Sequence, residues 1–276
     1  MTLFYGGGQL VALHRYPLKS AAAETLSSVD VSWSGLAGDR VWACVDADDV
    51  LVSAKKPRRF GRLLDVTAEE RGLGGLTVTM PGTAPASTTD GTANAALSTW
   101  LGTAVRLTRT APAGTRVHRW WPDEPGLVPE WMTDAEPGTD TTTPVGVEPG
   151  GRFFDFGAIH LVTTGALAAL AEQHGGPVAA GRFRPNLVLA LDDDPEPGQR
   201  LRIGADLVLS VTMPTPRCVV PSLAQPGGGP ADPGLLRTLA RHHRMPVATY
   251  GRATCFGRYA SVVEPGTVRV GDPVRA

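Results

Sequence analysis

Cysteine is scarce in this sequence of 276 residues, which has only Cys44, Cys218 and Cys255. The three are widely spaced, odd in number and form no Cys-x-x-Cys pair. The sequence therefore indicates neither a disulfide framework nor a structural zinc or iron–sulfur site. Because unpaired thiols of this kind are typical of a reducing compartment, we expect a cytoplasmic protein.

Long apolar runs are also missing. No window approaches the roughly 20 apolar residues of a membrane-spanning helix, and the N-terminus MTLFYGGGQLVAL has no basic leader. We therefore expect a soluble protein without a membrane partner. The formal net charge is −1 and aromatic residues make up 6% of the chain, with no basic block, so nucleic-acid binding is disfavoured.

Lysine occurs only at Lys19, Lys55 and Lys56, whereas arginine, alanine, glycine and proline are abundant. This bias is typical of a GC-rich bacterial genome. The rarity of lysine gives each of the three positions more weight as a candidate functional residue.

The pattern of the chain predicts a mostly β protein with a few helices, of one large domain or two small ones. Val41, Ala43 and Val45 alternate with polar or bulky neighbours, as in a half-buried strand. Short strands at such spacing suggest a small barrel or sandwich. The expected strands are 41–45, 50–54 after a turn at 46–49, 63–66, 76–80, 159–162, a strand from 187, a hairpin of 201–204 with 206–213, and two short strands around the Pro265–Gly266 turn.

Three helices are expected between these strands. The first covers 93–102 and ends at Gly102. Thr163 or Thr164 can cap the second, which Gly175 and Gly176 end, and the third covers 234–244. The segment 110–152 is rich in Pro, Gly, Asp and Thr, and its length indicates a functional loop or an interdomain linker. Trp120 and Trp121 within it either pack between domains or line a substrate entrance.

The stretch MPTPRCVVPS, residues 213–222, holds the cysteine of greatest interest. Pro214, Pro216 and Pro221 favour a rigid, non-helical turn directly after the predicted strand, so the thiol of Cys218 is held still. The adjacent Arg217 favours the thiolate, which attacks electrophiles and ligates metals. The alternative is that Cys218 is a small core hydrophobe. Cys44, in an alternating strand, is interpreted as structural, and the role of Cys255 stays open.

Several motifs together resemble the MOSC domain family, which includes amidoxime-reducing components and the C-terminal domain of molybdenum cofactor sulfurase. The first half carries HRYPLKS (14–20), GLAGDRVWACVD (35–46) and KKPRR (55–59). The second half carries HLVTTGALAAL, RFRPNLVL, PTPRCVVP and FGRYASVVEPGTVRVGDPV. The resemblance implies an α+β, mostly β architecture. A MOSC N-terminal β-barrel domain would cover 1–110, a linker or loop 111–152, and a MOSC β-barrel domain with a few helices 153–276.

The same resemblance implies a molybdenum cofactor, a molybdopterin whose metal is bound by one cysteine, here Cys218. Its phosphate and pterin ring ask for Lys, Arg and amide side chains, and molybdenum prefers soft sulfur. Relatives commonly have a serine where this chain has Ala166, and Thr163 or Thr164 can replace that contact. The implied cofactor-binding residues are Lys19, Ser20, Arg40, Thr163, Thr164, Arg184, Asn186 and Arg217.

Each of these residues also has a plain structural interpretation. Lys19 and Arg40 are consistent with solvated charges, and Arg184 with a residue that braces a turn. Asn186 is consistent with a cap or turn residue. His160, in an apolar strand, is expected to be a hydrogen-bonded core histidine. Asp155 is a carboxylate that could contact a ligating residue without binding the ligand itself.

Three functions follow from these alternatives. The first is a molybdenum-dependent oxidoreductase that removes oxygen from a small N-oxygenated substrate such as a hydroxylamine or amidoxime. A separate electron-transfer protein, flavodoxin-like or cytochrome b-type, would supply its electrons. The second is a sulfur-transfer or C–S bond-cleaving protein that uses Cys218 as persulfide or nucleophile, for instance in specialised metabolism. The third is a pterin-binding module without catalysis.

Overall fold

Seven strands close into a barrel in the computed structural model, which describes residues 7–71, 74–111, 114–145 and 151–275. The strands pair in the order β12-β13-β1-β19-β14-β15-β17, and β12 pairs with β17 to close the ring. Strand β1 comes from the start of the chain and pairs antiparallel with β13 and β19. The barrel strands are β1 (Gly8–Arg15), β12 (Ile159–Thr163), β13 (Leu187–Ala190), β14 (Arg200–Ile203), β15 (Leu207–Pro216), β17 (Arg252–Glu264) and β19 (Pro273–Arg275).

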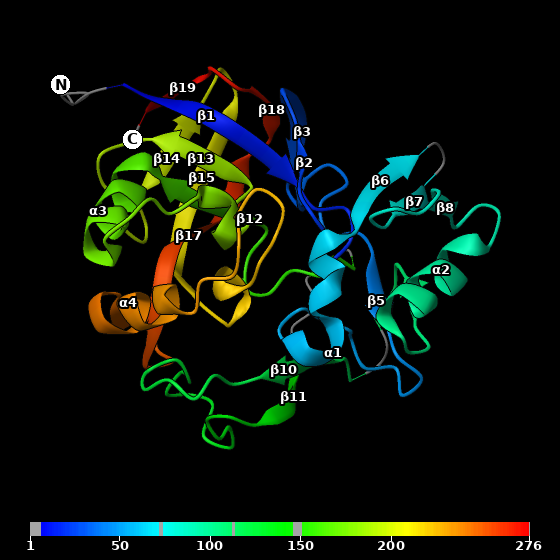
Figure 1. The fold of residues 1–276 in the computed structure, drawn as a ribbon. Coiled ribbons are helices and arrows are strands. Elements are labelled where there is room, and N and C mark those ends of the chain that lie inside the picture. The colour runs from blue at the N-terminus through cyan, green and yellow to red at the C-terminus, as the bar shows by residue number, and fades with distance from the viewer. Residues whose placement is uncertain (1–6, 72–73, 112–113, 146–150, 276) are drawn as a thin grey trace.

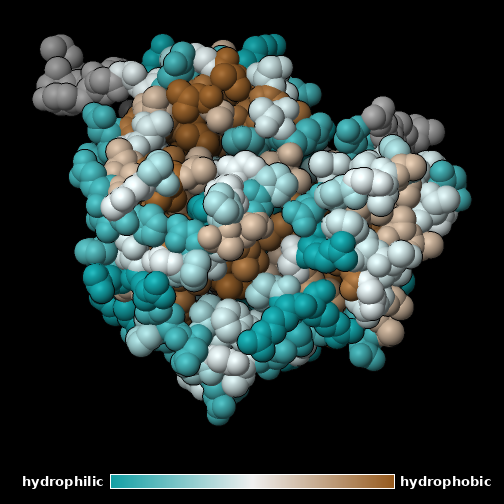
Figure 2. Space-filling view, in the orientation of Figure 1, coloured by the Kyte–Doolittle hydropathy of each residue, from teal (hydrophilic) through white to brown (hydrophobic). Residues whose placement is uncertain are grey.

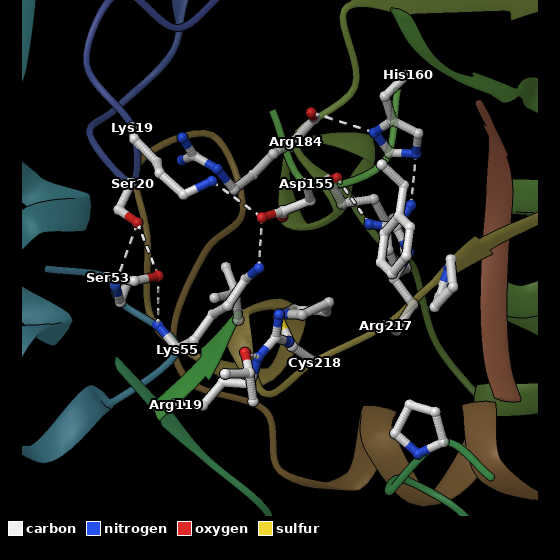
Figure 3. Close-up of a pocket in the computed structure, with 18 of the residues that line it drawn as sticks. Lys19, Ser20, Ser53, Lys55, Arg119, Asp155, His160, Arg184, Arg217 and Cys218 are labelled. Carbon is white, nitrogen blue, oxygen red and sulfur yellow. Dashed lines mark hydrogen bonds and ion pairs between the residues drawn. The ribbon is translucent and has the colours of Figure 1, made fainter. Parts of the chain in front are cut away.

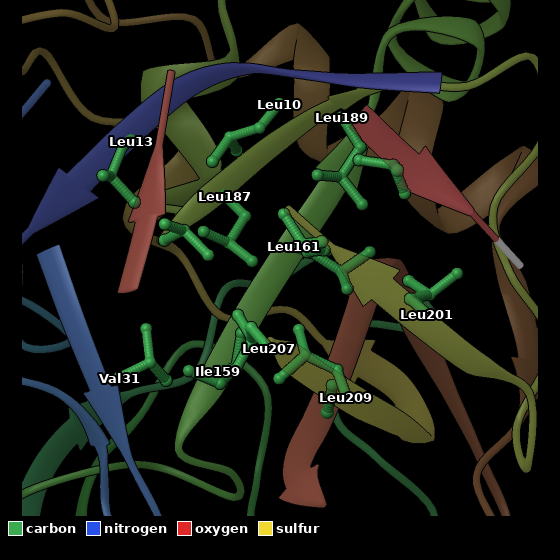
Figure 4. Packing of buried hydrophobic residues seen from close by; sticks show 14 of the residues in the cluster. Leu10, Leu13, Val31, Ile159, Leu161, Leu187, Leu189, Leu201, Leu207 and Leu209 are labelled. Carbon is green, nitrogen blue, oxygen red and sulfur yellow. The ribbon is translucent and has the colours of Figure 1, made fainter. Parts of the chain in front are cut away.

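The barrel interior is filled by aliphatic side chains. Alternate residues of a strand point to the same face, so Leu10 of β1 and Leu161 of β12 both point inward, and each is fully buried. Leu187, Leu201 and Leu209 meet them from the neighbouring strands (Figure 4). Burial of this apolar interior stabilises the fold.

A three-stranded sheet and two short strands extend the barrel. The sheet has the order β18-β3-β4, and its Val29, Val31 and Val268 pack against the barrel residues. The added elements are β2 (Glu24–Thr25), β3 (Ser28–Ser32), β4 (Gly35–Leu36), β16 (Arg244–Pro246) and β18 (Gly266–Arg269).

A second region lies beside the barrel and has its own core (Figure 1). Leu18, Trp42, Phe60, Leu76 and Leu97 are among the buried residues of that core. Its elements are β5 (Ala43–Val45), α1 (Pro57–Phe60), η1 (Gly61–Asp65), β6 (Thr67–Arg71), β7 (Gly75–Thr79), β8 (Ala86–Ser87), α2 (Thr92–Leu101) and β9 (Arg106–Thr108).

A hairpin and several helices complete the molecule. Strands β10 (Arg116–Trp120) and β11 (Asp140–Pro144) pair antiparallel and lie below both regions in Figure 1. The other helices are α3 (Thr164–His174), η2 (Ala180–Phe183), η3 (Val220–Ser222) and α4 (Gly234–His242). In the described part of the chain, no helix has both the length and the apolar character needed to cross a membrane.

The mostly β fold and most of the predicted elements are confirmed. Helix α2 ends at Gly102, whose φ of 66° is left-handed, and Thr163 caps α3 by accepting a hydrogen bond from the Ala166 amide at 3.2 Å. Gly175 ends α3, also in the left-handed region. The hairpin of β14 with β15 forms as expected.

Several local predictions were wrong. Residues 50–54 do not form the expected strand, and within them only Leu51 makes isolated β-bridges, to Val45 and Val117. Residues 63–66 lie mostly in the 3₁₀ helix η1 and not in a strand, and the Val66 amide donates to the Leu63 carbonyl at 3.1 Å. The segment 110–152 contains the β10–β11 hairpin, and β17 is a strand of 13 residues rather than a short one. Helix α4 ends at His242, because the next residues pair with β17 as β16.

Candidate functional site

A cavity of about 380 Å³ lies where the barrel meets the second region. Lys19 and Lys55 line it from the second region, and Arg184, Arg217 and Cys218 line it from loops at the end of the barrel. Figure 2 shows hydrophobic residues gathered near the middle of this face, between the two regions. Residues far apart in the sequence thus meet at one site.

Cys218 differs from the other two cysteines in its surroundings. It follows β15 directly, lines the cavity and is partly exposed, with Ala54, Leu64 and Val220 packed beside it. Cys44 and Cys255 are buried, and burial raises the pKa of each thiol to about 12. Of the three thiols, only that of Cys218 faces a space that a ligand can enter.

Asp155 is held between two lysines at the centre of the cavity (Figure 3). Lys19 Nζ lies 2.9 Å and Lys55 Nζ 2.6 Å from Asp155 Oδ1, and Lys19 also donates to the Phe153 carbonyl at 2.8 Å. Burial by itself raises the pKa of Asp155, but the two ammonium groups hold it well below its usual range. Burial, with the nearby Arg119 charge, lowers the pKa of Lys55 to about 8.

Two arginines stack on the buried ring of Tyr16 at one wall of the cavity. The guanidinium carbons of Arg40 and Arg184 lie 4.7 and 4.3 Å from the ring centroid. Arg40 also pairs with Asp39 at 2.5 Å, whereas Arg184 has no acidic partner among the described residues. Burial lowers the pKa of Arg184 to about 10. An anion entering the cavity therefore meets an uncompensated guanidinium.

Strained backbone is concentrated at this cavity. Among the described non-glycine residues, five have positive φ, and three of them line it: Ser20 at 67°, Arg40 at 50° and Arg184 at 55°. Such conformations cost energy and persist where the surrounding structure imposes them, most often at functional sites. Ser20 Oγ accepts a hydrogen bond from the Ala54 amide at 3.2 Å, which ties the Lys19 and Lys55 loops together.

His160 and Arg217 form a network behind Cys218. Arg217 donates from Nη2 to His160 Nε2 at 2.5 Å, and from Nε to the Phe256 carbonyl at 2.9 Å. His160 Nδ1 lies 3.3 Å from the Arg184 carbonyl. Burial, aided by the Arg217 charge, lowers the pKa of His160 well below its usual value, so the ring is neutral. Arg217 therefore acts here mainly as a brace between loops.

Three of the sequence-predicted binding residues lie outside the cavity lining. Thr163 donates to Asp194 Oδ1 at 2.9 Å and caps α3, and Thr164 lies within α3. Asn186 is fully buried and accepts from the His160 amide at 3.1 Å. The structure brings the other predicted residues together in the lining: Lys19, Ser20, Arg40, Arg184, Arg217 and Cys218.

Three cations in the lining, Lys55, Arg119 and Arg182, were not predicted as site residues. Lys55 belongs to the KKPRR stretch, and the rarity of lysine was the signal that could have identified it. Arg119 lies on β10, within a segment predicted to have little structure. No signal in the sequence could have singled out Arg119, because arginine is abundant in this chain.

Aromatic residues form the entrance of the cavity. The ring of Trp131 lies 6.4 Å from that of Phe156 and 5.7 Å from that of Tyr250. Trp131 belongs to the loop between β10 and β11, and Glu130 anchors this loop by pairing with Arg244 at 2.9 Å. Glu130 also accepts from the Arg252 amide at 2.8 Å. The loop therefore forms one side of the cavity.

Among the described residues that line the cavity, Cys218 is the only cysteine and Asp155 the only carboxylate. Within the described ranges, no group of three or more His, Cys, Asp or Glu side chains could hold a metal ion. A metal at Cys218 would thus need further donors from its own cofactor. The unpaired cations around the thiol suit an anionic cofactor of that kind.

Comparisons with known proteins identify the family to which this chain belongs. The family model of the MOSC N-terminal beta barrel domain matches residues 7–121, and that of the MOSC domain matches residues 151–275. Human (Homo sapiens) mitochondrial amidoxime-reducing component 1 is 30% identical over 119 residues, which cover 41% of this chain and 35% of that protein. The match thus spans about a third of that relative's length.

Two solved structures are also similar. The YUAD protein from Bacillus subtilis has a TM-score of 0.45 and 13% identity, covering 98% of this chain and 95% of its own. YiiM from Geobacillus stearothermophilus has a TM-score of 0.30 and 22% identity, covering 50% of this chain and 66% of its own. With both family models matched in order, the chain is a protein of the MOSC domain family, with a MOSC N-terminal β-barrel domain followed by a MOSC domain.

Proposed function

We propose that this protein is a molybdenum-cofactor-dependent oxidoreductase that reduces N-oxygenated substrates such as hydroxylamines or amidoximes. The observation that carries the proposal is the position of Cys218, whose thiol faces a cavity lined by cations with few acidic partners. The similarity to a protein named as an amidoxime-reducing component supports the choice of substrate class. Like other reductases of this kind, it would take electrons from a separate flavodoxin-like or cytochrome b-type protein.

The lining residues fit a molybdopterin. Its phosphate and polar pterin need several cations, which Lys19, Arg40 and Arg184 provide at one wall of the cavity. The metal of such a cofactor already carries sulfur donors, so the protein needs to supply only one cysteine ligand. When bound, the cofactor would supply two-electron oxygen-removal chemistry.

The side chains of the protein would position the substrate and supply protons. Reduction of an N–OH group to N–H takes two electrons and two protons and releases water. Lys55 Nζ, held 2.6 Å from Asp155, is a proton donor that borders the cavity. The loop of Trp131 and the ring of Tyr250 would limit access of bulk water.

Metal analysis of purified protein tests this proposal. Protein from a host that makes the cofactor is expected to carry close to one molybdenum per chain. Cys218→Ser should lose or alter that metal, and Cys255→Ala, which changes a buried thiol, should keep it. Reduction of benzamidoxime with a chemical reductant should follow the metal content. A native protein that folds in that host without molybdenum would refute the proposal.

A sulfur-handling role is the second candidate, and one observation favours it. The Cys218 thiol is partly exposed and packed against Ala54, Leu64 and Val220, an apolar setting that can shelter a persulfide. Intact-mass analysis after loading with a sulfur donor would show an added sulfur on native protein and none on Cys218→Ser. Protein that binds the pterin but neither reduces substrate nor carries sulfur would instead be a non-catalytic binding module.

A further inference from the structure

Arg119 is a cation that the proposed cofactor set leaves unused. It lies on β10, and its Nε donates to Thr143 Oγ1 at 2.9 Å. Neither of its terminal nitrogens has a hydrogen-bond or acidic partner in the part of the chain that the structure describes. Figure 3 shows its side chain beside Cys218 and below Lys55. Two N–H groups on one edge of a guanidinium thus remain free at the cavity.

The surrounding charges make an anion the fitting partner. In the part of the lining that the structure describes, Asp155 is the only carboxylate, and Lys19 and Lys55 already share its Oδ1. Arg217 donates to the Phe183 and Phe256 carbonyls, and Arg182 to the Pro221 and Pro230 carbonyls. Arg119 and Arg184 therefore have no direct ion pair among the described residues, and they lie on different regions of the molecule. A guanidinium with two free parallel donors matches a carboxylate.

Aromatic side chains line the same cavity as Arg119. Trp121 is 3% exposed, and the guanidinium carbon of Arg119 lies over its ring, 5.4 Å from the ring centroid. Phe156 and Tyr250 are 40% and 54% exposed, which is unusual for large aromatic side chains. Flat apolar surface of this kind binds another planar ring by stacking.

We propose that Arg119 binds a carboxylate on the substrate, while Trp131, Phe156 and Tyr250, which line the same cavity, pack against its planar body. The substrate is then an N-oxygenated aromatic acid. This inference rests on the proposed function for the chemistry at Cys218, but the binding of the acid by Arg119 does not depend on it. Thr143 fixes the direction of the guanidinium from the neighbouring strand β11.

Binding of benzoate and benzamide, measured by calorimetry on purified protein, tests the inference. The two probes share a ring and differ in charge. Benzoate should bind native protein and lose at least about tenfold in affinity in Arg119→Gln, since a hydrogen bond between charged groups is worth that much. Benzamide should bind weakly, with the same affinity in both.

Arg116→Gln is the matched control. Arg116 lies on the same strand and donates to Thr142 on β11 at 2.8 Å, but its side chain is exposed and outside the cavity. It should leave benzoate binding unchanged. Equal benzoate affinity in native protein and Arg119→Gln would overturn the inference. So would inorganic phosphate binding more tightly than benzoate, because the site would then prefer phosphate to carboxylate.

Cofactor content and kinetics separate this inference from the proposed function. Arg119→Gln should keep the molybdenum and pterin of the native protein, and their loss would mean that Arg119 holds the cofactor instead. In cofactor-loaded protein, Arg119→Gln should raise KM for 4-carboxybenzamidoxime and leave KM for benzamidoxime unchanged. Benzoate binding that depends on Arg119 in protein without molybdenum would support the anion site and refute only the redox proposal.

Discussion

The barrel interior and the cavity differ in the polarity of their side chains, although the same strands contribute to both. Ile159 and Leu161 of β12 point into the barrel, while His160 between them joins the network behind Cys218. The interior is wholly apolar, whereas the cavity gathers buried cations and left-handed backbone at Ser20 and Arg184. Buried charges and left-handed backbone cost free energy. The comparison indicates that the stability of the barrel offsets this cost at the cavity.

Truncation in the barrel should have the largest effect on stability. Leu161→Ala removes a fully buried side chain and leaves a cavity in a closed interior, so it should lower the free energy of unfolding by about 2–5 kcal/mol. Chemical denaturation measures this. Val11→Ala changes a side chain that is 39% exposed on β1 and should shift stability by less than about 0.5 kcal/mol. Similar losses in the two variants would contradict the assignment of the core.

Removing the central carboxylate of the cavity should have a smaller effect. Asp155→Asn keeps an oxygen near Lys19 and Lys55 but leaves two buried ammonium groups without a counter-charge. We expect a loss of about 1–3 kcal/mol at pH 7. Asp140→Asn is the control, because Asp140 pairs with Lys56 at 3.0 Å with half of its side chain exposed, and should cost at most about 1 kcal/mol.

The difference in the free energy of unfolding between native protein and Asp155→Asn should depend on pH, because the pKa of Asp155 is lowered in the folded state. A carboxyl whose pKa is lower in the folded than in the unfolded state stabilises the fold above its unfolded pKa of about 4. That stabilisation is lost as the pH falls toward the folded pKa. The gap between native protein and Asp155→Asn should therefore be full near neutral pH and narrow in acid. A gap that widens in acid would show that the carboxylate is not the stabilising partner.

The smallest effect is a shift in one titration. The Cε signal of Lys55 in ¹³C-labelled protein should titrate with a midpoint of about 8, because burial and the Arg119 charge lower its pKa. With only three lysines in the chain, Lys55→Arg assigns the signal directly. Asp155→Asn should lower the midpoint further, since Asp155 raises the pKa of Lys55. A midpoint near the ordinary lysine value would mean that Lys55 is solvated, unlike its neighbours in the cavity.

Much of the local structure was predictable because it depends on near neighbours. The Thr163 cap, the Gly102 and Gly175 helix ends and the β14–β15 hairpin all follow from residues a few positions apart. The 3₁₀ helix at Gly61–Asp65 was missed, since Leu63 is buried in the core of the second region and Leu64 is buried against Val220, which is distant in the sequence. The predicted boundaries at 110 and 152 could not show that β1 pairs with β13, because that pairing joins residues 9–13 to residues 187–190.

The residues of the candidate site also fall into those whose place in the cavity the sequence predicted and those whose place it did not. Cys218 and the motif residues Lys19, Ser20, Arg40 and Arg184 could be named from the sequence and do line one cavity. Asn186 and the two threonines could be named as well, but their side chains are used for structure.

The sequence by itself determined that a lone cysteine would sit on a rigid turn after a strand, because proline restricts the backbone locally. Only the tertiary structure decided which charges surround it. Arg119 and Lys55 reach the cavity through the β10–β11 hairpin and the loop before α1, more than 90 residues from Cys218. Long-range packing places those loops, and no pattern of neighbouring residues encodes the electrostatic result.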